Sequence, residues 1–376
     1  MASDLFNQTE LQLYDRQLIM PGFGTDAQKK LKLAKVLIVG AGGIGSPAAL
    51  YLAAAGVGVI GLVDGDTVEL SNLQRQILFQ FTSAGKTKVA EAALRLNALN
   101  PTIKVETHAM QLTPSNATAL VTPYDLVVDG SDNFATRYLV NDVCVKLDKP
   151  FVGASVFQWQ ANVAVYNLLI RSQSSLRSAT YRCLFPEPPS SDQMPDCNTV
   201  GVVGVVPGWC GVMAATEAIK VITGIGQPLV NRYMAYDASK GLVNTFNFTR
   251  DDDAVATIKN HPLGDYSVYG DGCAADTGAR EVTPQQLRSR LRQRLGVRLV
   301  DVREEHEHAL VNIGGDCIPV NDIRHRFNEI PRDVQVILYC RSGQRSSKAM
   351  EFLQQEKGYT NVYHLRGGIR AYMTEK

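Results

Sequence analysis

Residues 35–46 read KVLIVGAGGIGS, an apolar run that leads into a glycine-rich turn. Glycines at positions 40, 42 and 45 have the spacing G-x-G-x-x-G, which lets a strand-to-helix turn approach a phosphate group closely. The free N–H groups at the start of the helix that follows favour bound negative charge. The stretch therefore predicts a strand at 35–40, a helix at 46–55 and a nucleotide site between them.

Strand and helix patterns alternate through the first half of the chain. We predict further elements as follows: strands at 58–63, 104–108 and 126–129, helices at 86–97 and 136–147, β-structure at 151–166 and a helix at 212–222. This alternation is typical of an α/β fold with an open, mostly parallel sheet covered by helices on both faces. The glycine turn makes a Rossmann-like domain the expected form of that fold.

Composition limits the kinds of protein that the chain can be. With 376 residues, 45% hydrophobic and 20% charged, it is long enough for two or three globular domains. A net charge of +1 gives no bulk attraction to nucleic acid or to an anionic membrane. Seven scattered cysteines do not suggest a disulfide framework, and no basic segment followed by an apolar one marks the N-terminus. We expect a cytoplasmic protein with no membrane segment and no direct nucleic-acid partner.

One stretch, residues 36–63, contains no charged side chain and is long enough to be taken for a membrane span. Its glycines and Pro47 punctuate it as strand, turn, helix and strand. We expect it to be the buried centre of a parallel sheet.

The periodic pattern fades between residues 250 and 280. The segments Asp251-Asp252-Asp253, His261-Pro262 and Gly270-Asp271-Gly272 are typical of loops. We predict a first domain at 1–250, a linker at 251–279 and a smaller α/β domain at 280–376. The elements predicted in the smaller domain are a helix at 284–295, strands at 298–302 and 334–340, a helix at 346–356 and a strand at 361–365.

Polar residues group after two of the predicted strands. Asp64 ends the strand at 58–63, where an acid can bond a ribose hydroxyl group, a pattern that fits NAD or FAD as well as ATP. Asn72, Arg75 and Lys88 follow, and they suit a triphosphate whose α-phosphorus gains charge during reaction better than a dinucleotide. Asp132, after the strand at 126–129, is a candidate Mg²⁺ ligand. Taken singly, each of these residues is also typical of a solvated surface.

Residues 10–250 closely resemble the MoeB/ThiF branch of the ubiquitin-activating-enzyme family. The motifs that match are YDRQ at 14–17, GAGGIGS at 40–46, VDGD at 63–66, SNLQRQ at 71–76 and DGSDN at 129–133. The resemblance implies ATP-dependent adenylation of the C-terminal glycine of a small ubiquitin-like carrier that ends in Gly-Gly. It also implies a homodimer in which Arg16 reaches the site of the neighbouring subunit.

The resemblance assigns roles within the site. Arg75 and Lys88 would contact the phosphates of ATP, Asn72 the reacting centre, and Asp132 the Mg²⁺ ion. The full set of residues expected at the nucleotide is Gly40, Gly42, Gly43, Gly45, Asp64, Asp66, Asn72, Arg75, Gln76, Lys88, Asp132 and Asn133. Cys197 has two interpretations of equal weight: covalent chemistry with the activated carrier, as in the family, or an ordinary loop thiol.

Members of this family often bind a structural zinc ion through two C-x-x-C pairs, and the chain departs from that pattern. Cys183 remains, but Thr180 occupies the position of its partner, and residues 248–264 contain no cysteine. Tetrahedral zinc needs four good ligands. We therefore predict no zinc. Cys144 and Cys210 lie in apolar contexts typical of core residues.

A second reactive centre is CRSGQR at residues 340–345, which follows the apolar strand at 334–340. Loop amides and a helix N-terminus stabilise a thiolate or persulfide, and Arg341 and Arg345 add positive charge. A cysteine phosphatase uses a similar loop but has its arginine six positions after the cysteine, where this chain has Ser346. The shorter loop suits a sulfur atom better than a phosphate group. An inert cysteine at the end of a strand is the remaining interpretation.

Residues 280–376 resemble a single rhodanese domain. The motifs that match are LVDVRE at 299–304, CRSGQRS at 340–346 and LRGGI at 365–369. The resemblance implies that Cys340 carries persulfide sulfur. His306 and His308 have no cysteine or third histidine near them in the sequence, so we expect them to be solvated and not to bind a metal ion.

A nucleotide site and a reactive cysteine in one chain predict activation of a carboxylate followed by sulfur transfer to it. A persulfide on Cys340, loaded by a cysteine desulfurase or a small thiosulfur donor, would attack the acyl-adenylate, and Cys197 could reduce the product to a thiocarboxylate. The carrier stays open among the molybdopterin, thiamine, cysteine and tRNA-thiolation pathways. Two other functions explain fewer features: an NAD-dependent oxidoreductase, which leaves the cysteine loop unused, and a non-catalytic scaffold that docks carriers and sulfur donors.

Overall fold

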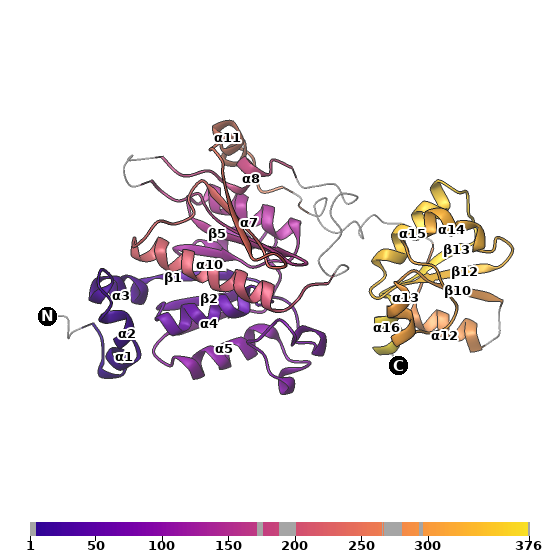
Figure 1. The fold of residues 1–376 in the computed structure, drawn as a ribbon, viewed down its shortest axis with the longest axis horizontal. Coiled ribbons are helices and arrows are strands. Elements are labelled where there is room, and N and C mark those ends of the chain that lie inside the picture. Colours follow the sequence, from indigo (N-terminus) through magenta and orange to yellow (C-terminus); the bar gives the residue numbers. More distant parts are fainter. Residues whose placement is uncertain are drawn as a thin grey trace. The chain divides into compact units, whose positions relative to one another are not determined.

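The computed structural model describes residues 5–170, 176–187, 201–264, 266, 280–292 and 296–374. It divides into two compact units, residues 1–271 and 272–376, which are described separately. Each unit contains a parallel or mostly parallel sheet covered by helices (Figure 1). The α/β class expected from the sequence is confirmed.

Eight strands form the sheet of the first unit. In chain order they are β1 (Lys35–Val39), β2 (Val59–Val63), β3 (Lys104–His108), β4 (Leu126–Asp129), β5 (Phe151–Phe157), β6 (Gln160–Tyr166), β7 (Arg232–Asp237) and β8 (Leu242–Asn247). Their order in the sheet is β3-β2-β1-β4-β5-β6-β7-β8, with β1 to β5 parallel and the remaining pairings antiparallel. The β-structure expected at 151–166 is the hairpin of β5 and β6, which turns at Gln158 with a positive φ.

Helices cover both faces of this sheet, and further helices of the first unit pack on that cover. They are α1 (Gln8–Leu13), α2 (Asp15–Leu18), α3 (Gly24–Leu33), α4 (Gly45–Ala55), α5 (Lys88–Leu99), α6 (Ala117–Val121), α7 (Phe134–Lys146), α8 (Tyr181–Leu184), α10 (Val205–Thr223) and α11 (Asp252–Asn260). One core cluster joins the sheet to α3, α4, α5 and α10, and a second joins it to α6 and α7.

The alternation of side chains along β1 explains this two-sided cover. Val36 and Ile38 belong to the core cluster that includes α4, while Leu37 and Val39 belong to the cluster that includes α7. An uninterrupted apolar run is typical of a parallel strand that is buried on both faces. The uncharged stretch 36–63 accordingly folds as β1, α4 and β2.

Helix α10 is longer than the helix predicted at 212–222, because it begins at Val205. By length and composition it could cross a membrane, but Cys210, Ala214 and Ala218 lie in the core with α4 and the sheet. Gly211 permits this packing, since a Cβ atom there would lie 2.2 Å from the carbonyl oxygen of Ile44. Burial in the core accounts for the apolar composition of the helix.

Helix α11 lies inside the segment 251–279 that the sequence analysis assigned to a linker. Its Val255 and Ile258 pack against Val145 of α7, and the first unit extends beyond residue 250 to about residue 271. The expected boundary at residue 250 is corrected by this packing. Asp251 caps the helix, since its carboxylate accepts a hydrogen bond from the amide of Ala254 at 3.0 Å. The three aspartates that were interpreted as a loop are therefore a helix-start signal.

The described residues of the second unit form a five-stranded sheet whose strand pairings are parallel. Its strands are β9 (Glu281–Val282), β10 (Val297–Asp301), β11 (Asp316–Cys317), β12 (Gln335–Tyr339) and β13 (Val362–Leu365), in the order β11-β10-β12-β13-β9. Its helices are α12 (Pro284–Arg292), α13 (Glu305–Leu310), α14 (Ile323–Arg326), α15 (Gln344–Gln355) and α16 (Gly368–Thr374). One core cluster includes α14 and α15, and the other includes α12 and α16.

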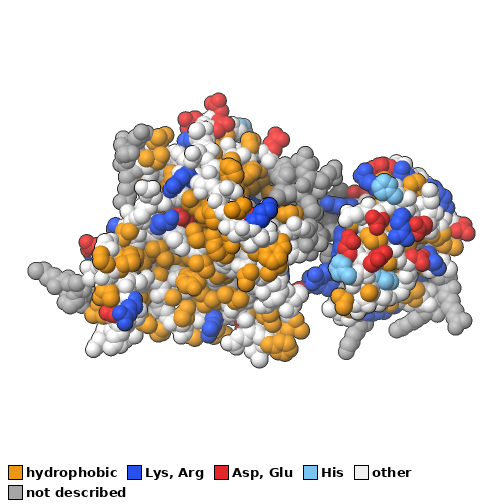
Figure 2. Space-filling view, in the orientation of Figure 1, with side chains coloured by type: hydrophobic (Ala, Val, Ile, Leu, Met, Phe, Trp, Pro, Cys, Tyr) orange, Lys and Arg blue, Asp and Glu red, His pale blue; other side chains and the backbone are white. Residues whose placement is uncertain are grey.

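The two units differ in the character of their surfaces. Figure 2 shows hydrophobic side chains spread over the visible face of the first unit, and cationic and anionic side chains intermixed over that of the second. Large exposed hydrophobic residues of the first unit include Val205, at the start of α10, and Leu242, Val243 and Phe246 on β8. Exposed apolar surface of this kind is typical of contact with another protein.

The packing of α11 can be tested by truncating one of its buried side chains. Ile258→Ala should lower the free energy of unfolding of the first unit by about 2 kcal/mol, because it removes apolar contacts with α7. Thr257→Ala, on the exposed side of the same helix, is the matched control and should change it by less than about 0.5 kcal/mol. The only two tryptophans, Trp159 and Trp209, lie in the first unit, so urea unfolding followed by tryptophan fluorescence reports on that unit. Equal effects of the two substitutions would contradict the packed helix.

Candidate active site

The glycine turn lies at the carboxyl end of β1 and leads into α4. Gly40 has φ +86°, a conformation that favours glycine, and a Cβ atom on Gly45 would lie 1.8 Å from the carbonyl oxygen of Gly40. The strand end and the first turn of α4 therefore touch through backbone atoms alone. The amide of Ala41 in this turn donates a hydrogen bond to Asp64, at the end of the neighbouring β2, at 2.8 Å.

The structure brings three predicted residues together beside this turn. Lys88, the first residue of α5, is only 6% exposed and donates to the carboxylate of Asp66 at 2.8 Å. Its Nζ atom lies 3.8 Å from Asp64, and the amide of Asp66 donates to Asp64 at 2.9 Å. Burial raises the pKa of Asp64, although the charge of Lys88 acts in the opposite direction. The site thus holds a buried ammonium group whose partners are two carboxylates.

The segment after β2 covers the same turn. A short 3-10 helix, Leu70–Asn72, buries Asn72, whose side-chain oxygen accepts from the amide of Glu69 at 3.0 Å. Two side chains that follow, Arg75 and Gln76, approach the turn closely. A Cβ atom added to Gly43 would lie 3.4 Å from Cγ of Arg75. A Cβ atom added to Gly42 would lie 3.7 Å from Nε2 of Gln76. The predicted residues 72, 75 and 76 are therefore grouped at the glycine turn.

The carboxyl end of β4 supplies the next part of the site. Asn133 caps α7 by accepting from the amide of Thr136 at 2.8 Å, and the exposed Asp132 accepts a long contact from Asn133 at 3.5 Å. Among the described residues, no group of three or more His, Cys, Asp and Glu side chains gathers as a metal site. One carboxylate beside a phosphate site is nevertheless a donor set that Mg²⁺ accepts, because the ion takes its other oxygens from phosphate and water.

Sequence reasoning missed a mostly buried arginine behind this strand end, with its side chain 12% exposed. Arg137 of α7 donates to the carbonyl oxygen of Ser131 at 3.2 Å, and its Nε atom lies 3.8 Å from the fully buried Asp129. It lines a small cavity together with Tyr181 and Tyr233. Arg137 stands four positions after the N-cap Asn133, but nothing local marks it as buried, since its partners come from β4 and from residues far along the chain.

Two predicted residues are not brought to the glycine turn by the described part of this chain. Arg16 lies on α2 with its side chain 90% exposed, and its Nε atom is 4.0 Å from the neighbouring Asp15. Cys197 lies outside the described residues. Their expected roles remain predictions.

Cys183, the cysteine retained from the zinc pattern, accepts hydrogen bonds from the backbone. The amides of Thr180 and Asp251 each donate to its sulfur at 3.3 Å. These contacts join the start of α8 to the N-cap of α11. Cys144 and Cys210 are buried in the core, as expected, and burial raises the pKa of the Cys210 thiol to about 12.

In the second unit, Cys340 follows β12 and its loop leads into α15. The buried sulfur accepts from the amide of Gly343 at 3.2 Å, and the hydroxyl group of Ser346 lies 3.6 Å away. Gly343 has φ +102°, and a Cβ atom on Gly368 would lie 2.4 Å from the carbonyl oxygen of Cys340. Glycine at both positions therefore permits the loop to fold around one sulfur atom.

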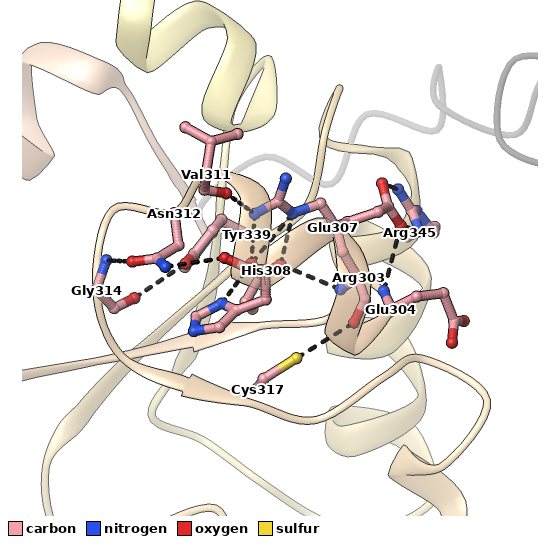
Figure 3. A network of polar contacts seen from close by, with 11 residues as sticks. Arg303, Glu304, Glu307, His308, Val311, Asn312, Gly314, Cys317, Tyr339 and Arg345 are labelled. Carbon is pink, nitrogen blue, oxygen red and sulfur yellow. Dashed lines mark hydrogen bonds and ion pairs between the residues drawn. The ribbon is translucent and has the colours of Figure 1, made fainter.

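A network of polar contacts borders the cysteine loop (Figure 3). Arg303 binds the buried carboxylate of Asp301, and His308 bonds the same carboxylate at 2.9 Å. The expectation that His308 is solvated is wrong, because Asp301, seven residues before it, turns inward at the end of β10. Arg345, in the first turn of α15, pairs with Glu307 of α13 at 2.6 and 2.9 Å. This pair joins residues 38 positions apart, so sequence reasoning missed it.

Comparison with known proteins gives relatives that span most of the chain. The probable adenylyltransferase/sulfurtransferase MoeZ of Mycobacterium tuberculosis is 40% identical over 373 residues, which cover 97% of this chain and 93% of that protein. The adenylyltransferase and sulfurtransferase MOCS3-2 of Zea mays is 35% identical, covering 96% of this chain and 78% of its own. The sulfur carrier protein adenylyltransferase of Thermus thermophilus is 47% identical over 233 residues, 62% of this chain and 85% of that protein.

Structural and family comparisons agree with these relatives. E. coli MccB with AMPCPP and MccA matches with a TM-score of 0.57 and 25% identity, covering 65% of this chain and 73% of that one. The ThiF family model matches residues 14–256, and the rhodanese-like domain model matches residues 283–375. The chain therefore belongs to the ThiF family, as an adenylyltransferase joined to a rhodanese-like sulfurtransferase domain.

Proposed function

We propose that this enzyme uses ATP to adenylate the C-terminal glycine of a ubiquitin-like sulfur carrier and then converts that carboxylate to a thiocarboxylate with sulfur from Cys340. One observation carries the proposal. The same chain has a glycine-rich backbone turn next to a buried lysine, and a cysteine whose sulfur accepts a hydrogen bond from a loop amide. The names of its relatives, which join adenylyl transfer to sulfur transfer, support it. Neither an NAD-dependent oxidoreductase nor a scaffold accounts for both features.

The first half-reaction takes place at the glycine turn. The carrier carboxylate attacks the α-phosphorus of ATP, a new oxygen–phosphorus bond forms, and the bond to pyrophosphate breaks. Lys88 and Arg75 offset the charge that develops on the phosphates, and Asn72 orients the reacting centre. Asp64 bonds a ribose hydroxyl group. Mg²⁺, when bound at Asp132, neutralises phosphate charge.

The second half-reaction starts from a persulfide on Cys340. Its terminal sulfur attacks the acyl carbon of the adenylate, AMP leaves with the electron pair, and an acyl disulfide to Cys340 forms. A thiolate, which we assign to Cys197, then attacks the Cys340 sulfur. The thiocarboxylate leaves, and the two cysteines are joined by a disulfide that an external thiol reduces.

Several partners belong to this proposal. The sulfur donor is a cysteine desulfurase or a small thiosulfur compound, and the reaction takes place in the cytoplasm. The working form is a homodimer, in which the exposed Arg16 of one subunit completes the nucleotide site of the other.

The adenylation step can be tested by carrier-dependent exchange of pyrophosphate into ATP, with a panel of Gly-Gly-ended carriers. Lys88→Ala should lower the exchange rate about a hundredfold or more, because the phosphates lose a buried cation. Lys86→Ala, two residues away and exposed, is the matched control and should change it by less than about twofold. Absence of exchange with every carrier, while ATP still binds, would refute the adenylation step.

The sulfur step can be separated from adenylation with one substitution. Cys340→Ala should keep pyrophosphate exchange but abolish the mass gain that marks replacement of one carrier oxygen by sulfur. Cys317→Ala, in the same unit and hydrogen-bonded to the backbone of Arg303, should retain both reactions. Intact mass of the carrier after incubation with ATP and a sulfur donor measures the outcome. Thiocarboxylate formation by Cys340→Ala would show that the sulfur comes from elsewhere.

The role of Arg16 can be tested by mixing two inactive variants. Arg16→Ala and Lys88→Ala should each lack exchange activity alone. After co-refolding or subunit exchange, mixed dimers contain one site with both residues intact, so part of the activity should return. A mixture no more active than its parents would place Arg16 in the site of its own subunit or outside the site.

A further inference from the structure

The arginine of the cysteine loop is already occupied by a carboxylate of the same unit. Both terminal nitrogens of Arg345 contact Glu307, at 2.6 and 2.9 Å, and the two side chains are 14% and 24% exposed. A bidentate pair of this form is the arrangement by which arginine recognises carboxylates, phosphates and other oxyanions. The guanidinium group of Arg345, which could hold a tetrahedral anion at the cysteine loop, is therefore bound to Glu307 (Figure 3).

Glu307 is fixed in this position by its own surroundings. One of its oxygens also accepts from the amide of Glu304 at 3.2 Å, at the start of α13. Burial opposes ionisation of Glu307, but the hydrogen bonds and charge of Arg345 outweigh it and hold the pKa of Glu307 below its ordinary value. Glu307 is therefore ionised at neutral pH, and the pair with Arg345 carries no net charge.

The remaining donors around Cys340 suit a single sulfur atom. The amide of Gly343 and the hydroxyl group of Ser346 point at the sulfur itself. They can stabilise a thiolate or the terminal sulfur of a persulfide without help from a guanidinium fork. A dianion with several oxygens, such as thiosulfate or phosphate, would in contrast have to displace Glu307 before the guanidinium group of Arg345 could bind it.

We propose that Glu307 is a specificity-determining residue, which holds Arg345 and so favours persulfide donors over tetrahedral dianions at Cys340. The inference rests on the proposed sulfur transfer. From a persulfide donor, the outer sulfur moves to the Cys340 thiolate and the donor leaves as a thiol. From thiosulfate, the same sulfur moves and sulfite leaves with the electron pair of the broken S–S bond. Only the second reaction brings a dianion into the loop.

The test uses the full-length chain with Glu307→Gln, which keeps the shape of the side chain and removes its charge. Loading of Cys340 is measured with thiosulfate and with glutathione persulfide. We expect the ratio of the kcat/KM for thiosulfate to that for the persulfide to rise about tenfold, mainly through a lower KM for thiosulfate, because Arg345 becomes available. Glu305→Gln removes the same charge from an exposed position of the same helix and should leave the ratio unchanged.

A double variant and the unmodified chain complete the test. In the double variant Glu307→Gln/Arg345→Gln, the tenfold rise in the kcat/KM ratio should disappear, because the guanidinium group of Arg345 is absent. The proposal would be overturned if Glu307→Gln left the ratio of the two kcat/KM values unchanged, or lowered both kcat/KM values equally. The Glu307–Arg345 pair would then have a structural role only. If Glu307→Gln does not fold, the unmodified chain decides: competitive inhibition of persulfide loading by low millimolar sulfate would overturn the proposal, and insensitivity would support it. Failure of the unmodified chain to accept sulfur from either donor would instead refute the proposed sulfur transfer.

Discussion

Both candidate sites depend on the close approach of the backbone at the end of a parallel strand to the turn or helix beside it. At Gly45 a Cβ atom would lie 1.8 Å from the carbonyl oxygen of Gly40, and at Gly368 it would lie 2.4 Å from that of Cys340. These contacts require glycine, and they bring amide groups and a helix N-terminus to one point. The first unit has this arrangement at the glycine turn between β1 and α4, and the second has it at the loop that follows Cys340. Both candidate sites thus use the same kind of backbone contact.

The cations of the two sites are bound by carboxylates of the same chain. The two carboxylates differ in how easily an incoming anion can replace them. Lys88 contacts Asp66, whose side chain is 58% exposed and can turn to solvent when a phosphate arrives. Arg345 contacts Glu307, which is less exposed, bidentate and also bonded to a backbone amide. Separating a partly solvated carboxylate from its cation costs little free energy, because water can solvate the carboxylate. A shielded carboxylate that is separated from its cation loses the attraction that offsets its own desolvation. The first arrangement fits a cation that must accept an incoming anion, and the second fits one that must not.

Local sequence signals predicted the parts of the fold that depend on local structure. The apolar run before Gly40 and the loop at Cys340 define a strand, a turn and a helix within a dozen residues each, and both were found. Helix α11 was missed because Asp251 and its neighbours are equally typical of a loop, and only packing of Ile258 on α7 distinguishes the two. The Glu307–Arg345 pair was missed because no local pattern specifies which of many charged side chains meet between two helices, here α13 and α15. Arg75 lies beside Gly43 and Lys88 lies beside Asp64, because the parallel strands β1 and β2 end at one edge of the sheet.

The joint between α8 and α11 is held by one sulfur atom and by apolar packing. A single sulfur, that of Cys183, accepts hydrogen bonds from the amides of Thr180 and Asp251, so it satisfies backbone donors at the starts of both helices. Hydrogen bonds to sulfur are weak. Val255 and Ile258 are buried beside the same cysteine, and burial of an aliphatic side chain contributes about 1.5–3 kcal/mol. The hydrophobic contact therefore supplies most of the stability of the joint, and the sulfur mainly satisfies amides that the packing would otherwise leave unpaired.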